Sequence, residues 1–233
     1  MEKKSEMTHQ EMKSLIKKII IRFSLLPVVL GLLILIPAGT FNYWQVYIYF
    51  SILVVPMTFV LLYFLKNDPE FLERRTKAKE KEKQQFFISI LSTLIFLAGF
   101  IIPGLDHRFT WSYVPMHLTI SADIIILMGY LIIFFVFKQN SYASRIIEVN
   151  ENQKLISTGL YAIVRHPMYI GVLIMFLPTP IALGSYWGLI PFALFPVSLV
   201  LRILNEEKVL TDNLEGYKEY CQKTRYRLIP FIW

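Results

Sequence analysis

Residues 117–137, HLTISADIIILMGYLIIFFVF, decide the fold that this sequence predicts. The stretch contains no Lys or Arg, and Asp123 is its one acidic residue. A helix needs about 20 apolar residues to cross a hydrocarbon core about 30 Å thick, so this stretch is long enough to span a bilayer. Similar apolar runs lie at residues 19–38, 43–65, 87–104, 168–184 and 186–204. The sequence therefore predicts an all-α membrane protein, folded as a polytopic helical bundle.

The number of spans is five or six, because the runs at 87–104 and 168–184 are short for a crossing. A re-entrant hairpin formed by the last two runs would leave both of its ends on the same side. The composition agrees with a membrane protein: 55% of the 233 residues are hydrophobic and 18% are charged. Soluble domains have about 25% charged residues. Buried helices of a soluble protein are the alternative, and so many apolar runs in so short a chain argue against it.

The basic residues are distributed unevenly and set the predicted orientation. Arg108 is the one Lys or Arg in the connections after the first, third and fifth runs. The other 23 of the 24 lie toward the opposite ends of the runs. Basic residues concentrate on the cytoplasmic side of membrane proteins, so both termini are expected in the cytoplasm. The excess of basic residues behind the net charge of +7 is thus explained by orientation of the chain in the lipid bilayer, and we expect no nucleic-acid partner.

The chain divides into three predicted parts. Residues 1–18 form a charged cytoplasmic head, residues 19–137 a transmembrane scaffold of about four spans, and residues 138–233 a region rich in polar motifs. In this last region the apolar segments RIIEV and KLIS flank the turn-forming NENQ, which predicts a small β-hairpin at 146–157.

An amphipathic cytoplasmic helix is predicted after the last span. Leu210, Leu214, Tyr217 and Cys221 follow one another at helical spacing and form one apolar stripe. Gly216 is placed where it can interrupt this helix.

Several classes of site are excluded by the residue inventory. Cys221 is the single cysteine, and the four histidines have no spacing suited to a metal, so no metal site is expected. The sequence has no glycine-rich phosphate loop and no GxSxG motif. Asp123 is a candidate because an acid inside a span is often functional, although it lies close to one end of its run.

The stretch GLYAIVRHPMYIG, residues 159–171, predicts an anion site where the fifth run begins. His166 precedes a proline and is expected to be extended, whereas Pro167 is suited to start a helix. The positive end of that helix and the planar donors of Arg165 favour a carboxylate or phosphate. The alternative is that Arg165 and His166 only anchor the helix among lipid headgroups.

A second charged cluster follows the sixth run. Arg202 and Glu206 are four residues apart and share a helical face, and Glu207 adjoins them. Because the fifth and sixth runs are joined by a short connection, they are expected to be antiparallel neighbours, with this cluster beside Arg165. An anion site facing an acidic site would suit a zwitterionic ligand. A solvated amphipathic helix is the alternative.

These motifs resemble the isoprenylcysteine carboxyl methyltransferase family. The resemblance rests on RHPMYIG, on Arg202 followed after three residues by Glu206 and Glu207, on Tyr217 and Tyr220, and on a late proline. It covers about residues 141–233, and the family belongs to a broader membrane group that includes phospholipid N-methyltransferases. The resemblance implies S-adenosylmethionine as cofactor, bound between the last two helices and the C-terminal segment, and a lipophilic acceptor that enters from the lipid.

The resemblance also implies roles for individual residues. Leu160 stands where the family usually has a proline, which removes no polar group. Glu207 is favoured over Glu206 for the ammonium or ribose of the cofactor. No catalytic residue is assigned, and Arg202 and Tyr217 are expected on the substrate side. The expected cofactor-binding residues are Tyr161, Arg165, His166, Tyr169, Glu206 and Glu207.

The chemistry of the acceptor leaves two forms of methyl transfer open. A carboxylate is already ionised and needs no general base, so carboxyl O-methylation of an isoprenylcysteine-like substrate is favoured. An amine would need a base such as His166 or a glutamate, as in a phospholipid-type N-methyltransferase. An NADPH-dependent membrane reductase and a non-enzymatic membrane protein are the remaining alternatives.

Overall fold

The computed structural model describes residues 8–76, 83–144, 146–147, 149 and 153–233, and in these residues the regular structure is helical. The helices are α1 (His9–Ala38), α2 (Trp44–Asn67), α3 (Pro69–Thr76), α4 (Lys83–Phe109), α5 (Met116–Gln139), α6 (Leu160–Ile163), α7 (Pro167–Phe176), α8 (Thr179–Ala182), α9 (Leu189–Ala193), α10 (Phe195–Asn213) and α11 (Tyr217–Lys223).

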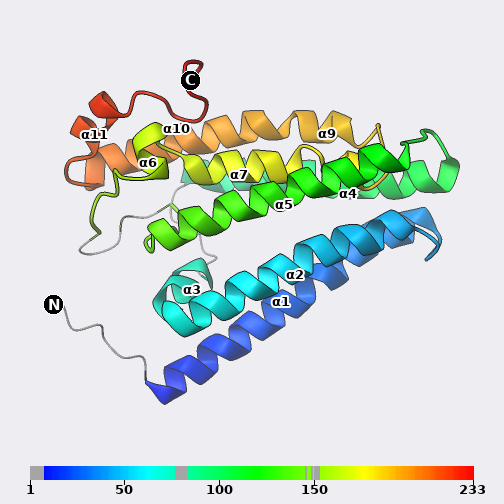
Figure 1. The fold of residues 1–233 in the computed structure, drawn as a ribbon, viewed down its shortest axis with the longest axis horizontal. Helices are drawn as coiled ribbons and strands as arrows, with labels where there is room; N and C mark the ends of the chain where they lie inside the picture. The colour runs from blue at the N-terminus through cyan, green and yellow to red at the C-terminus, as the bar shows by residue number, and fades with distance from the viewer. Residues whose placement is uncertain (1–7, 77–82, 145, 148, 150–152) are drawn as a thin grey trace.

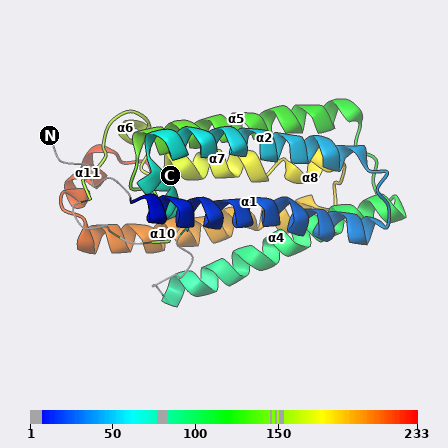
Figure 2. The ribbon, with the colours of Figure 1, turned by 90° about the horizontal axis from the view of Figure 1, so that it is seen from below.

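The long helices run along one axis and form a bundle, as the two perpendicular views show (Figures 1 and 2). Five helical segments are long and apolar enough to cross a membrane, namely α1, α2, most of α4, α5, and residues 189–213. The apolar segment at 167–182 is shorter. The prediction of a polytopic helical membrane protein is thus confirmed.

The last two apolar segments, α7–α8 and α9–α10, extend along the whole bundle. The turn between α8 and α9 packs at the far end, opposite α11, because the Tyr43 hydroxyl donates to the carbonyl of Leu183 there. At the same end, Asp106 is buried and accepts hydrogen bonds from the backbone N–H of Ser112, at 2.8 Å, and from the hydroxyl of Ser185. Although α7 and α8 are short, they therefore reach the end where α1 meets α2.

A close contact between α5 and α7 fixes the position of the segment that begins with RHP. Gly129 and Gly171 face each other, and a Cβ at Gly129 would lie 2.8 Å from the Gly171 carbonyl oxygen. Small residues allow membrane helices to approach closely through van der Waals contact. Helix α7 is thereby held against α5, with its N-terminus at the end of the bundle that carries α11 (Figure 1).

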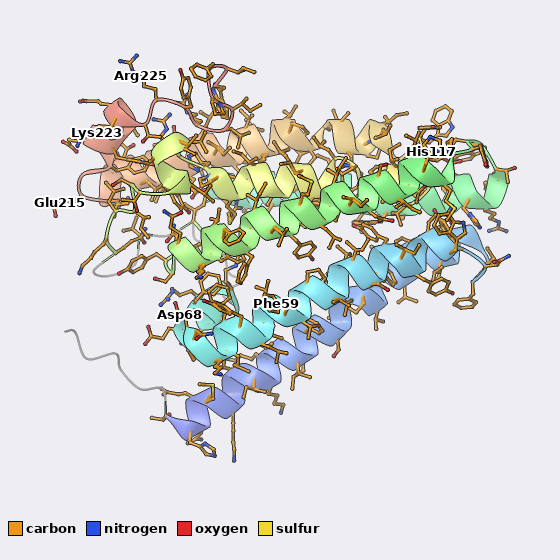
Figure 3. All side chains as sticks on the ribbon, in the orientation of Figure 1. Phe59, Asp68, His117, Glu215, Lys223 and Arg225 are labelled. Atoms are coloured by element: carbon orange, nitrogen blue, oxygen red, sulfur yellow. The ribbon has the colours of Figure 1, made fainter. Side chains whose placement is uncertain are left out.

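Helix α2 contacts α5 through aromatic side chains. Phe59 of α2 lies against Phe134 of α5, with ring centroids 5.6 Å apart (Figure 3). The short helix α3 inserts Phe71 between α2 and α5. The centroid of the Phe71 ring is 4.4 Å from that of Phe64 and 5.0 Å from that of Phe137. Thus α3 joins the end of α2 to the end of α5, after which the polar region begins.

In the C-terminal region, the structure differs from the predicted β-hairpin and divides the predicted amphipathic helix. The described residues within 146–157 form no strand, so the predicted hairpin is not found there; residues 148 and 150–152 lie outside the described residues. The predicted amphipathic segment is divided at Gly216, whose φ of 78° ends one helix and precedes α11. Part of its apolar stripe is nevertheless buried: Leu214 and Tyr217 form a second core cluster with Tyr220, and Leu210 and Cys221 pack against it partly buried.

Candidate functional site

The segment before α7 pairs with the C-terminal tail. Pro167 is the first helical residue, as predicted. His166 has φ −125° and ψ 59°, which is not helical but is not the extended conformation that was expected either. The backbone N–H groups of Arg165 and His166 donate to the carbonyls of Tyr226 and Arg227, both at 2.9 Å. These two N–H groups are therefore used within the protein and are not available to an anion.

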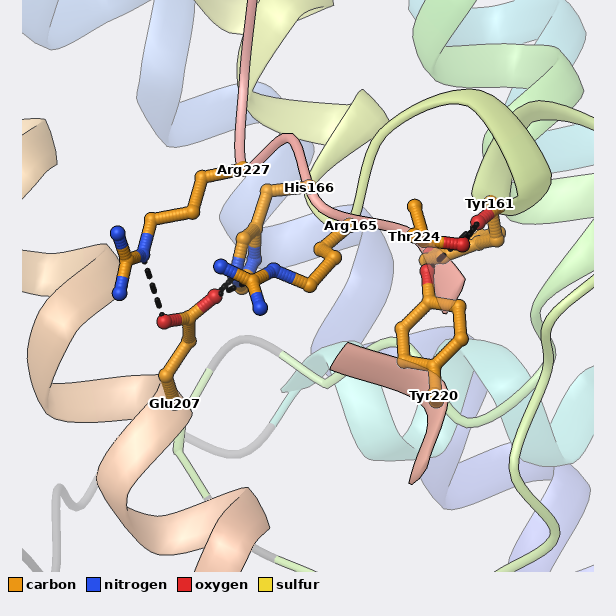
Figure 4. A network of polar contacts seen from close by, with 7 residues as sticks. All are labelled: Tyr161, Arg165, His166, Glu207, Tyr220, Thr224 and Arg227. Atoms are coloured by element: carbon orange, nitrogen blue, oxygen red, sulfur yellow. Dashed lines mark hydrogen bonds and ion pairs between the residues drawn. The ribbon is translucent and has the colours of Figure 1, made fainter. Parts of the chain in front are cut away.

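Glu207 lies at the centre of a buried ion-pair cluster (Figure 4). Arg165 Nε is 2.9 Å from Glu207 Oε1, in an ion pair without an aligned hydrogen bond, and His166 Nε2 is 3.3 Å from the same oxygen. Arg227 Nε donates to Glu207 Oε2 at 2.7 Å. The cluster joins three distant segments: the start of α7, helix α10 and the tail.

The cluster carries more positive than negative charge, because two guanidinium groups face one carboxylate. The side chains of Arg165 and Glu207 are only 7% and 11% exposed, and such a pair is costly to break because a buried charge would lose its partner. Sequence analysis missed Arg227. The basic tail segment KTRYR gave a signal, but its pairing with α10 depends on how the tail folds back.

A second polar chain lies beside the first, on the pocket side of α10. The Tyr169 hydroxyl donates to Glu206 Oε2 at 2.5 Å and accepts from Arg202 Nε at 2.9 Å. Tyr169 is 4% exposed. Its hydroxyl is held between the carboxylate of Glu206 and the guanidinium of Arg202. Neighbouring Glu206 and Glu207 thus belong to different networks.

A pocket opens between α6, α7, α10, α11 and the segment after α5. The empty space between these elements is about 880 Å³, a volume that includes open solvent at the mouth of the pocket. Glu207 is not among the lining residues, whereas Glu206 is. The residues expected from sequence that line the pocket are Tyr161, Arg165, His166, Tyr169, Arg202, Glu206 and Tyr217.

Tyr217 has the most informative hydroxyl in the pocket. This hydroxyl is buried and has no hydrogen-bond partner among the described residues. By contrast, Tyr220 donates to the carbonyl of Tyr161 at 2.7 Å. Burial raises the pKa of both Tyr217 and Tyr220, so both hydroxyls keep their protons at neutral pH. A buried donor without a protein partner is costly unless a bound molecule satisfies it.

Tyr161 is held in the wall of the pocket by the end of α5. Its hydroxyl accepts from Asn140 Nδ2 at 2.8 Å, and burial raises the pKa of Tyr161 to about 12. Gly159 precedes it with a φ of 58°, and a Cβ there would lie 2.2 Å from Gln139 Nε2. Glycine is favoured here by the positive φ, a backbone conformation that other residues rarely adopt.

The scaffold also supports the pocket through two arginines of α3. Arg74 Nε donates to the carbonyl of Ser141 and Arg75 Nη1 to that of Ser144, both at 2.9 Å. Ser144 and the intervening Tyr142 line the pocket. Helix α3 thus holds the wall that follows α5.

Asp123 does not line this pocket. It is 2% exposed, and neither carboxylate oxygen has a hydrogen-bond partner among the described residues. Its predicted role in chemistry stays a prediction. Across the residues that the structure describes, no group of three or more His, Cys, Asp or Glu side chains is arranged to hold a metal ion.

Comparison with known families adds to this geometry. Residues 118–216 match the model of a family described as phospholipid methyltransferase. The matched segment runs from α5 to the loop before α11 and includes Arg165, Glu206 and Glu207. It ends just before Tyr217, so Arg227 and the tail lie outside it. The match supports a membrane methyltransferase.

A curated relative gives a second, partial likeness. The Delta(14)-sterol reductase of Mus musculus is 30% identical to this chain over 86 residues. The aligned part is 35% of this chain and 20% of the reductase, so the chain spans about a fifth of that relative's length.

Proposed function

We propose that this chain is an integral membrane methyltransferase that uses S-adenosylmethionine to methylate a lipophilic acceptor. The observation that carries the proposal is the pocket itself, in which positive, acidic and aromatic groups meet at one end of an apolar bundle. The region 138–233 supplies most of this site. From the distribution of basic residues, we propose that both termini and the pocket face the cytoplasm.

The residues present fit the cofactor. S-adenosylmethionine supplies an electrophilic methyl group on a sulfonium, together with a carboxylate, an ammonium and a ribose. Arg165, the arginine of the net positive cluster that lines the pocket, suits the carboxylate. Glu206 lines the pocket and suits the ammonium or the ribose hydroxyls. Tyr217, which was expected on the substrate side, lines the same pocket, and its buried hydroxyl has no partner among the described residues, so we propose that it donates to the cofactor instead.

This assignment changes the role proposed for the acidic pair. Glu207 was favoured for the cofactor on sequence grounds, but its two oxygens already face Arg165, His166 and Arg227. We therefore propose that Glu206 contacts the cofactor and that Glu207 positions Arg165 and the tail around it.

The acceptor is proposed to be a carboxylate attached to an isoprenoid-like chain. Arg202 lines the pocket toward the apolar part of α10 and can orient a carboxylate there. A carboxylate needs no base, so positioning and removal of water carry the reaction. The family match favours a second candidate, an amine on a phospholipid, for which Glu206 or His166 would accept the proton.

Transfer of a labelled methyl group tests the proposal and separates these candidates. The purified protein in lipid would receive methyl-labelled S-adenosylmethionine with either a prenylated cysteine or phosphatidylethanolamine. Label on the prenylated cysteine supports the carboxyl reaction, and label on the amine supports the second candidate. The partial likeness to a sterol reductase favours a third candidate, so NADPH oxidation with a sterol is measured in parallel.

The free hydroxyl of Tyr217 gives a specific prediction. Tyr217→Phe removes no hydrogen bond within the described protein, so the free energy of unfolding should not fall. The affinity for S-adenosylhomocysteine should fall about 5–10-fold, as expected for loss of one hydrogen bond worth about 1 kcal/mol or slightly more. Calorimetric titration and thermal unfolding measure the two quantities.

Tyr220→Phe is the matched control for this substitution. Its hydroxyl bonds the Tyr161 carbonyl within the protein, so its loss should lower stability. If Tyr217→Phe lowers stability and leaves affinity unchanged, the hydroxyl serves the fold and not a ligand.

A further inference from the structure

The end of the chain forms an apolar loop whose side chains point outward. Ile229, Phe231 and Ile232 are 46%, 88% and 77% exposed. Leu228, directly before them, is buried in the main core. The backbone N–H of Trp233 donates to the carbonyl of Ile229 at 3.0 Å, which closes the loop. Three large apolar side chains are therefore presented on a folded turn.

The loop lies where the polar end of the bundle meets its apolar part. Tyr226 and Arg227 pair with the two residues that precede Pro167, the first residue of α7. Figure 1 shows the end of the chain level with the beginning of α7, set back along the bundle axis from α11. Helix α7 carries no charged residue, so the loop stands where the polar end of the bundle gives way to an apolar segment.

The residues leading to the loop are basic. Lys223 and Arg225 are exposed, and Figure 3 shows their side chains pointing away from the bundle. With Lys218 and Arg227 they outnumber Glu219, the one acid between 217 and 233. An exposed apolar group flanked by basic residues matches the interface of a bilayer that contains anionic lipids.

We propose that the loop 228–232 docks into the headgroup region of an anionic bilayer. Exposed apolar patches commonly mark contact surfaces, and this one lies beside the start of the apolar helix α7. Lipid on one side and Glu207 on the other would then hold the segment around Arg227. The inference goes beyond the proposed methyltransferase function and does not depend on what the pocket binds.

Site-directed spin labelling tests this docking directly. The chain has one cysteine, so Cys221→Ser gives a background into which Phe231→Cys or Ile232→Cys introduces a single label. Lys223→Cys is the matched control, because it lies in the same tail on an exposed polar position. Each labelled full-length protein is placed in vesicles of phosphatidylcholine and phosphatidylglycerol, and collisions with oxygen and with a water-soluble nickel chelate are measured.

The expected result is an oxygen-to-nickel accessibility ratio several-fold higher at 231 and 232 than at 223, because oxygen concentrates in lipid. Equal ratios at all three positions would place the loop in water and overturn the proposal. Low collision rates with both reagents at 231 and 232 would mean that protein covers the loop, which would also overturn it. Thermal unfolding of each labelled protein verifies that it is folded.

Discussion

Glu207→Ala is expected to destabilise the protein strongly. The substitution leaves Arg165 and Arg227 facing each other without the carboxylate that they share. Breaking a buried ion pair by removing one partner costs about 3–5 kcal/mol, so the free energy of unfolding should fall by about that amount. Unfolding by denaturant in a fixed micelle composition measures this difference.

Glu215→Ala is the control for this prediction, because Glu215 is an exposed acid in the loop that follows α10. It should leave the free energy of unfolding nearly unchanged. Equal stability of the two variants would contradict a buried ion-pair cluster around Glu207.

Glu206→Gln is expected to weaken binding of S-adenosylhomocysteine about 10–100-fold while leaving the protein folded. The amide keeps the shape of the side chain and can still accept from Tyr169, but it loses the negative charge that faces the pocket. Hydrogen bonds to charged groups contribute about 1.5–3 kcal/mol, which gives this range of affinity. Calorimetric titration of the variant and the native protein measures the change.

The neighbouring substitution Glu207→Gln makes this test discriminating. If Glu206→Gln binds as the native protein does and Glu207→Gln loses affinity without losing stability, then Glu207 is the ligand contact. Glu219→Gln, an exposed acid on α11, controls for a general change of charge and should bind normally.

The helical membrane fold could be predicted from sequence because long apolar runs have a direct physical cause. The run at 117–137 became α5 with bounds within a few residues. The hairpin at 146–157 was not found in the described residues, since two short strands that pair only with each other are marginally stable at best. That α7 and α8 reach the far end depends on tertiary contacts such as Ser185 with Asp106.

The types of residue in the pocket could be predicted from the sequence, but not which charged side chains pair with each other. Spacing placed Glu206 and Glu207 together near Arg165, and the structure brings them together. Spacing does not distinguish which face each adjacent glutamate takes, because that depends on the rotation of α10. The role of Arg227 required the tail to fold back. The hydroxyl of Tyr217 is informative because no described residue is its hydrogen-bond partner, which the sequence does not reveal.

Calorimetric titration of the native protein in lipid with S-adenosylhomocysteine tests the central claim most directly. Binding at one site per chain with micromolar affinity, and no binding of NADPH under the same conditions, is the result that this account predicts. Absence of S-adenosylhomocysteine binding to a protein whose cooperative thermal unfolding shows that it is folded would contradict the account.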